Sequence, residues 1–278
     1  MNIIEIVKDS LRYPFSDWKK ILVLGIFGVI ATLSINELIG AVDLALYDTS
    51  DLFMAFLSII GLLSIFIERG YQFRILNSSL SSMAELPKFN SWAGMLKDGV
   101  KLSIVTVIYL IPFILIYLVL KSPFVAILQL TFKSLPSLLS STIIPLKITF
   151  FTAIGPLHLI GFSILILFMN LLFIMFLLSI ANMAKNNGKL TAAFQFHQIT
   201  NKLSTLGWKN FVVWYLMTES IYLIILSISG IVINEISHLI SPNVGTALGW
   251  LIATVLISLI VISYLSMYLY RSLALLFL

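Results

Sequence analysis

One carboxyl group stands in a stretch of sequence too apolar to solvate it. Glu219 lies within VVWYLMTESIYLIIL, eleven residues after Trp208. A helix rises about 1.5 Å per residue, so Glu219 would lie roughly 16 Å beyond Trp208, near the middle of a bilayer's hydrocarbon. A charge there costs about 2.5–3.5 kcal/mol. The carboxyl is therefore expected to be paired, hydrated or protonated, and to face the interior of a helix bundle.

Three other polar residues are expected near this carboxyl. Tyr215 and Tyr222 lie four residues before and three residues after Glu219, on the same helical face, and Asn170 is expected at a comparable depth in another apolar segment. These four residues form a predicted mid-membrane polar site, and no Lys or Arg is expected at that depth. Three interpretations remain open. The site is a set of hydrogen bonds that stabilises the bundle, or part of a proton or cation pathway, or the span that contains Glu219 is misplaced.

Other patterns that could support catalysis or metal binding are weak. The three histidines, His158, His197 and His238, are scattered, and the chain has no cysteine. Glu235 and His238 could share a helical face, but a metal site needs three or four ligands. No G-x-S-x-G, H-E-x-x-H or P-loop pattern occurs. We expect no catalytic residue, no bound metal and no cofactor, and we expect that the protein is not an enzyme.

The composition indicates an integral membrane protein. Apolar residues make up 60% of the 278 residues and charged residues only 10%, against about 25% charged in an ordinary soluble domain. A soluble fold of this size could not hide so much apolar surface. The net charge of +5 comes from basic residues dispersed between apolar runs, so nucleic acid is not expected as a partner.

Six apolar stretches are long enough to span a bilayer, which takes about 20 residues each. We predict a single transmembrane domain, 1–278, with spans at about 21–40, 52–69, 102–120, 157–183, 210–234 and 245–268. The second span is short, and Glu68 with Arg69 is interpreted as a pair that extends its inner end toward the headgroups. The segment 123–147 is interpreted as an outer interfacial or re-entrant segment.

The basic residues predict the orientation. With six spans and a cytoplasmic N-terminus, only Lys121, Lys133 and Lys147 of the 17 Lys and Arg residues lie outside. A seventh span at 123–147 would move Lys185, Lys189, Lys202 and Lys209 outside, against the positive-inside rule. We therefore predict a multi-pass protein of the cell (cytoplasmic) membrane with both termini cytoplasmic.

Three similar segments precede the odd-numbered spans. Residues 2–13, 72–83 and 191–204 each carry an apolar stripe of helical period, and each is followed by a tryptophan at the start of a span. We expect these segments to be amphipathic helices at the cytoplasmic interface, and Trp18, Trp92 and Trp208 to be interfacial anchors. The predicted fold class is all-α: a bundle of six transmembrane helices with interfacial amphipathic helices on the cytoplasmic side.

The sixth span carries small residues at regular spacing. Gly245, Gly249 and Ala253 follow one another at intervals of four and would allow a neighbouring helix to approach closely. We expect this stripe to serve helix packing within the chain, and a dimer contact is the alternative.

Several motifs resemble those of a known family. The motifs are SLRYPFSDWKK, then GYQFR, then ELPKFNSWAGMLKDGVK leading into IYLIPF, with AAF at 192–194 further on. They resemble an uncharacterised prokaryotic, largely archaeal, membrane protein family, domain-of-unknown-function family 4013. The resemblance extends over nearly the whole chain and implies a polytopic membrane protein. It implies no activity and no catalytic residue.

Two functions from different classes follow from these observations. The first is a non-enzymatic accessory or envelope-organising component that acts through contacts with membrane lipids or with a protein partner. The second is a transporter or channel-like permease with a polar mid-membrane site near Glu219. A hydrated cavity at mid-depth would favour the second.

Overall fold

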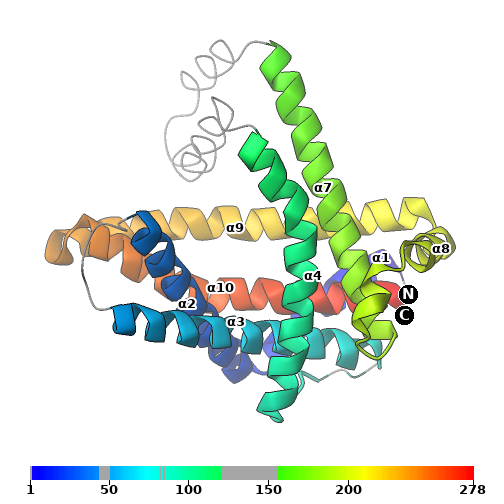
Figure 1. Ribbon diagram of the computed structural model, residues 1–278, viewed down its shortest axis with the longest axis horizontal. Coiled ribbons are helices and arrows are strands. Elements are labelled where there is room, and N and C mark those ends of the chain that lie inside the picture. The colour runs from blue at the N-terminus through cyan, green and yellow to red at the C-terminus, as the bar shows by residue number, and fades with distance from the viewer. Residues whose placement is uncertain (1, 44–50, 82, 84, 120–155) are drawn as a thin grey trace.

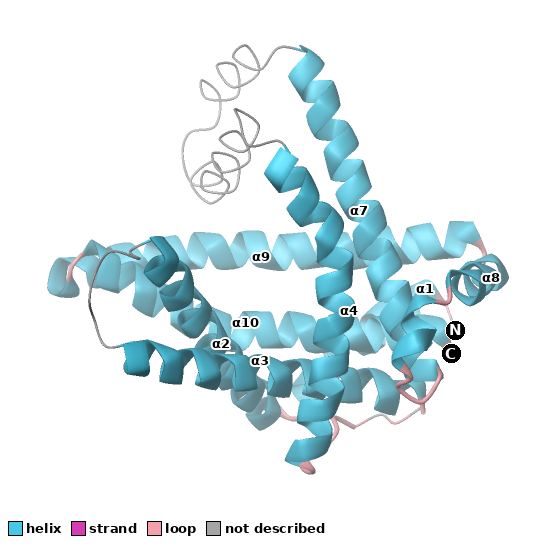
Figure 2. Ribbon diagram, viewed as in Figure 1, coloured by secondary structure: helices cyan, strands magenta, loops and turns pink. Residues whose placement is uncertain are grey.

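In the computed structural model, the chain is built from helices joined by short turns (Figures 1 and 2). The structure describes residues 2–43, 51–81, 83, 85–119 and 156–278, and these contain no strand. The predicted interfacial segment 123–147 therefore lies outside the described residues. The described helices are α1 (Ile3–Arg12), η1 (Tyr13–Ser16), α2 (Trp18–Asp43), α3 (Asp51–Leu80), α4 (Trp92–Val119), α7 (Pro156–Lys185), η2 (Leu190–Phe194), α8 (Phe196–Leu206), α9 (Trp208–Val244) and α10 (Thr246–Phe277).

The helices have the length and composition of membrane spans. Among the described residues, five helices are long and apolar enough to cross a bilayer, namely α3, α4, α7, α9 and α10. Side chains such as Leu115, Leu167 and Leu223 on these helices are more than half exposed, as expected for surfaces that face lipid. The predicted all-α membrane bundle is confirmed. The number of crossings and their exact limits remain a prediction.

Helix α10 is the centre of the bundle. It packs against α2, α3 and α9, while α3 also packs against α4. Figure 1 shows α9 and α10 running side by side, with α4 and α7 leaning steeply across them. The chain therefore has one layer of roughly aligned helices and a pair of helices that crosses this layer.

Two glycines allow α3 and α4 to approach closely. A Cβ atom at Gly70 of α3 would lie 1.9 Å from the backbone oxygen of Met95, and one at Gly99 of α4 would lie 1.8 Å from that of Phe66. A Cβ atom at Gly25 of α2 would likewise lie 1.9 Å from the backbone oxygen of Leu259 in α10. Backbones at this distance have no room for any side chain, so these glycines determine where the helices cross.

Side chains from three helices hold the segment 85–91, which precedes α4. The Tyr13 hydroxyl donates to the Glu85 carbonyl (3.2 Å), the Lys20 ammonium to the Leu86 carbonyl (2.8 Å) and the Tyr71 hydroxyl to the Pro87 carbonyl (2.9 Å). The Tyr71 ring also stacks on that of Phe89, with centroids 3.9 Å apart. Carbonyl groups outside regular structure need such partners, and these contacts fix the point at which α4 begins.

The three tryptophans predicted as anchors are each the first residue of a helix. Trp18 begins α2, Trp92 begins α4 and Trp208 begins α9. Their side chains are 62%, 47% and 62% exposed, respectively. Exposed indole rings at helix starts suit an interfacial location, which remains a prediction.

Two of the three predicted amphipathic segments are separate short helices. Helix α1 buries Ile6 and Val7, and α8 buries Ile199 and Leu203. The start of the third predicted segment differs, because residues 190–194 form the 3-10 turn η2 and the α-helix begins only at Phe196.

The prediction of a separate helix at 72–83 is wrong. Residues 72–80 are the last turns of α3, which continues without a break to Leu80. Phe73 and Leu76, which suggested an interfacial stripe, are fully buried against other helices of the bundle. An apolar stripe looks the same in sequence whether lipid or protein covers it.

The end of α10 packs against α1, so the two termini lie close together at one end of the molecule (Figure 1). The Arg271 guanidinium donates from Nε to Asp9 (2.8 Å) and from Nη1 to the Met83 carbonyl (2.6 Å). It also lies over the Tyr13 ring, 4.6 Å from its centroid. Arg271 is only 5% exposed. Its contacts tie together α10, α1 and the segment after α3.

The predicted small-residue stripe is only partly helical. Gly249 lies against Ser241 of α9, where a Cβ atom would come within 2.6 Å of the Ser241 hydroxyl, and Ala253 is fully buried. Gly245 is instead the turn between α9 and α10, with φ of +87°, and a Cβ atom added there would meet nothing within 4 Å. Glycine therefore allows the positive φ of this turn and does not make room for a neighbouring helix.

Candidate functional site

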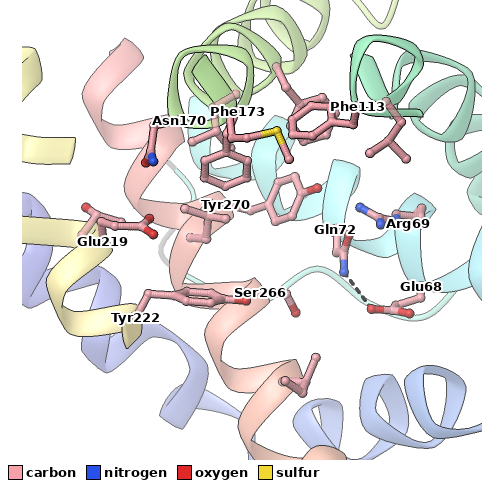
Figure 3. A pocket seen from close by; sticks show the side chains of 17 residues that line it. Glu68, Arg69, Gln72, Phe113, Asn170, Phe173, Glu219, Tyr222, Ser266 and Tyr270 are labelled. Atoms are coloured by element: carbon pink, nitrogen blue, oxygen red, sulfur yellow. Dashed lines mark hydrogen bonds between the residues drawn. The ribbon is translucent and has the colours of Figure 1, made fainter. Parts of the chain in front are cut away.

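A pocket lies where the crossing helices α4 and α7 meet α3, α9 and α10 (Figure 3). Its volume is about 630 Å³, within the usual range of small-molecule sites, about 300–1,000 Å³. Most of the lining is apolar or aromatic, and three ionisable groups, Glu68, Arg69 and Glu219, reach it. A mostly apolar pocket with a few charged groups is typical of a ligand site.

The charged groups lie in one layer of the bundle. Glu219 follows the first residue of α9 by eleven positions, and Arg69 precedes the last residue of α3 by eleven positions. Both helices are continuous over these stretches, so each group is about 16 Å from the end of its helix at 1.5 Å per residue. The short helices α1 and α8, which are predicted to lie on the cytoplasmic side, lie toward these helix ends (Figure 1).

The structure brings together the four residues of the predicted polar site. Asn170 of α7, with Glu219 and Tyr222 of α9, lines the pocket. Tyr215 lies just behind it and donates a hydrogen bond of 2.7 Å to the Asn170 side-chain oxygen. The Asn170 amide donates in turn to the Ile166 carbonyl (2.8 Å). This pair links α7 to α9 beside the pocket.

Glu219 itself is not part of that hydrogen-bond pair. Its side chain is half-buried and turned toward the pocket (Figure 3). Within the described part of the chain, its carboxyl makes no hydrogen bond and no ion pair, and the nearby Tyr215 and Tyr222 interact with it only electrostatically. The expected hydrogen bonds join Tyr215 to Asn170 instead, so the Glu219 carboxyl remains available to a ligand.

Sequence reasoning missed the residues on the opposite wall. Glu68 and Arg69 were expected to mark the inner end of the second span, with no basic group at the depth of Glu219. Helix α3 continues well beyond them, and both residues line the pocket. The available signal was the apolar period that continues through Phe73 and Leu76, which predicts that the helix does not end at Arg69.

The two charged residues of α3 differ in their surroundings. The Glu68 carboxylate accepts a hydrogen bond of 2.9 Å from the Gln72 amide and lies against Gly28 of α2. The Arg69 guanidinium lies beside the Tyr270 hydroxyl in the pocket (Figure 3). In the described residues, no carboxylate oxygen is within ion-pair distance of Arg69.

His197 and His238, the two histidines whose side chains the structure describes, lie at separate sites. His197 contacts the Asn201 side chain at 3.1 Å, and His238 lines a separate, open pocket between α9 and α10. No group of three or more potential metal ligands occurs among the residues that the structure describes. The pocket with Glu219 and Arg69 is therefore the arrangement in the described chain best suited to chemistry or binding.

A carboxylate and a guanidinium in a largely apolar pocket can hold a charged or polar molecule away from lipid. Both groups are fixed on long helices, which keep their positions better than loops do. In a medium of low polarity, each charge also interacts strongly with a ligand of complementary charge.

Comparison with known proteins gives a family and no activity. A family described as a protein of unknown function, DUF4013, matches residues 53–234. The chain therefore belongs to this family, as its motifs indicated. The comparisons with curated proteins and with solved structures gave no match.

Proposed function

We propose that this DUF4013 protein is a membrane permease that binds a small polar solute in the pocket between α3, α7, α9 and α10. The pocket with Glu219 and Arg69 is the observation that carries the proposal. Ionisable groups in the middle of a span are costly, and in membrane proteins they usually mark a pathway for a substrate or an ion. We further propose that the protein is not an enzyme.

The arrangement of the helices supports this reading. Five helices contribute to the pocket, and two of them, α4 and α7, lean across the others (Figure 1). A site formed between two sets of helices can open alternately to either side if one set rocks against the other. The proposed motion is a change in the angle of α4 and α7 relative to α9 and α10.

The proposed location is the cell membrane, with both termini in the cytoplasm. The uneven distribution of Lys and Arg supports this orientation. The two termini also lie at the same end of the bundle, as an even number of crossings requires.

Uptake into proteoliposomes tests the proposal. Purified protein is reconstituted, and uptake of labelled amino acids, amines, carboxylates and sugars is measured against empty liposomes. We expect uptake of at least one class, and we expect Glu219→Gln to abolish it. Glu235→Gln is the matched control, because Glu235 lies on the same helix α9 but is exposed near its far end. Uptake that is absent for every class, or unchanged by Glu219→Gln, would refute the proposal.

A second candidate is the accessory role through lipid contacts, and α8 is the observation that favours it. Helix α8 buries one face and leaves Phe196 exposed (51%) at its start, while Trp208, just after its end, is 62% exposed. Lys202 and Lys209 lie nearby and could attract anionic headgroups, each contributing about 1 kcal/mol. Under this reading, Lys202→Gln with Lys209→Gln should lower the number of anionic lipids retained by the purified protein and leave its folding unchanged.

A further inference from the structure

We infer that the pocket takes a dipolar ligand, with a cationic group bound at Glu219 and an anionic group bound at Arg69. This inference rests on the proposed function and names the chemical class of its solute. It follows from the position of the two charges, from the absence of an ion-pair partner for either among the described residues, and from an unsatisfied hydrogen-bond acceptor in the pocket wall.

The opposite charges stand on opposite walls. Figure 3 shows Glu219 and Tyr222 on one side of the pocket, Arg69 and Gln72 on the other, and Tyr270 between them. The Tyr222 hydroxyl is within electrostatic range of both Glu219 and Arg69. Both charges line one pocket of about 630 Å³, the size of a small-molecule site, so one molecule held there can contact both.

Neither charge has an ion-pair partner among the described residues, although the Arg69 guanidinium is hydrogen-bonded to the Tyr270 hydroxyl and is attracted to the Glu68 carboxylate. Glu219 has no hydrogen bond or ion pair there, and Arg69 has no carboxylate within ion-pair distance. Taking a charge out of water costs several kcal/mol unless a partner replaces the water. A ligand that carries both opposite charges supplies a partner to each wall in a single binding event.

Glu68 excludes ligands of a single charge. With Glu68 included, the pocket has two carboxyl groups and one guanidinium. A lone anion would meet a surplus of negative charge, and a lone cation would leave the Arg69 guanidinium without an anionic ligand group. The hydrogen bond from Gln72 and the contact with Gly28 hold the Glu68 carboxylate at the edge of the site, where it forms no ion pair with Arg69. The Arg69 donors that do not bond to Tyr270 are therefore available to a ligand.

Gln72 is the second, independent sign of a ligand. Its side chain is only 4% exposed and lines the pocket, and its amide oxygen has no hydrogen-bond partner. A buried acceptor left unsatisfied costs about 1–3 kcal/mol. A ligand N–H group, or a water carried with the ligand, would satisfy this oxygen. The aromatic lining, which includes Phe113 and Phe173, suits an apolar body between or beside the charged groups.

Two sources offer this chemistry. A free amino-acid-like zwitterion carries an ammonium and a carboxylate, and a zwitterionic phospholipid headgroup carries an ammonium and a phosphate. Both would place their cationic group at Glu219 and their anionic group at Arg69. The experiment therefore includes one arm for each source.

Binding to the purified full-length protein in detergent tests the inference, with thermal stabilisation and calorimetry as readouts. The free-solute arm uses glycine, leucine and phenylalanine. Each is paired with its amine, which lacks the carboxylate, and with its acid, which lacks the ammonium. The lipid arm uses phosphoethanolamine and a short-chain phosphatidylethanolamine, with the matching phosphatidylglycerol as the control that lacks the ammonium.

We expect at least one dipolar compound to bind at least about tenfold more tightly than both of its single-charge analogues, because each charge-assisted contact contributes. Glu219→Gln and Arg69→Gln should each weaken the binding of that compound by about tenfold or more. Glu235→Gln and Arg12→Gln are the matched controls, since both residues are exposed and distant from the pocket. Arg69→Lys keeps the charge and should retain part of the affinity even if Arg69→Gln does not fold.

The outcomes separate this inference from the proposed function. An amine or an acid that binds as tightly as its zwitterion, or a sugar that is the only ligand, overturns the dipolar class and leaves the permease proposal standing. Binding confined to phosphatidylethanolamine supports a dipolar ligand but excludes a free amino-acid-like solute as that ligand. Failure of every compound to bind, together with no uptake into proteoliposomes, overturns both.

Discussion

Replacing Gly99 with alanine should push α3 and α4 apart. A Cβ atom at Gly99 would lie 1.8 Å from the Phe66 backbone oxygen, whereas ordinary contact begins at 3.4 Å, so the backbones must separate by about 1.6 Å along that line. The obstacle is a backbone atom and cannot rotate away. Overpacking of this kind lowers the free energy of unfolding by about 3 kcal/mol, and the higher helix propensity of alanine raises it by about 1 kcal/mol. We expect the free energy of unfolding to fall by about 2 kcal/mol.

The assay is reversible unfolding in mixed micelles, followed by tryptophan fluorescence. Gly230→Ala is the matched control, because a Cβ atom at Gly230 in α9 meets nothing within 4 Å. This control should be neutral or gain up to about 1 kcal/mol. Gly70→Ala should resemble Gly99→Ala and should also weaken ligand binding, since Gly70 is next to Arg69. If Gly99→Ala were as stable as Gly230→Ala, the close approach of α3 and α4 would be refuted.

Two further predictions concern the end of the molecule where the termini meet, and a third concerns the membrane topology. Arg271→Met should lower the free energy of unfolding by about 2–4 kcal/mol, because the contacts of Arg271 with Asp9 and Met83 are lost. Arg12→Met is the control, because Arg12 is exposed. An equal loss of stability in both variants would show that the contacts of Arg271 do not stabilise the bundle. Burial and the neighbouring Lys185 ammonium lower the pKa of Lys202 from its ordinary value of 10.5. The unfolded chain thus binds the proton more strongly, and the wild type gains stability as the pH rises through the lowered pKa toward 10.5. Near neutral pH, the free energy of unfolding of Lys202→Met should therefore exceed that of the wild type by a few tenths of a kcal/mol, and this difference should shrink at high pH and in high salt. A difference that grows with pH would contradict this prediction. Reporter fusions at positions 46, 135, 195 and 278 should report the first two outside and the last two in the cytoplasm, and an external residue 195 would refute six spans.

The physical class and the starts of several helices could be predicted from local properties. Long apolar runs with few charges have no stable alternative to spanning helices, because only a lipid solvent tolerates so much apolar surface. The starts of α2, α4 and α9 coincide with Trp18, Trp92 and Trp208 for a related reason. Each tryptophan stands where a polar segment changes to an apolar one.

The position of Glu219 along α9, eleven residues beyond Trp208 in an uninterrupted helix, was also predictable, since helix rise is constant. The faces of Tyr215 and Tyr222 followed from the same helical period. These predictions need only the geometry of one helix, so no tertiary information was required.

Only the tertiary structure decided what stands opposite Glu219. Glu68 and Arg69 could extend a span at its end or line a pocket in its middle, because long charged side chains occupy either environment. The choice depends on which helices cross α3, and that crossing is set by the contacts of Gly70 and Gly99 with the backbone of the facing helix. Such contacts join residues far apart in the chain and leave no periodic signal. The sequence therefore determined that a carboxyl group stands in the apolar stretch of α9, and the packing of α3 against α4 and α10 determined that a guanidinium lines the same pocket.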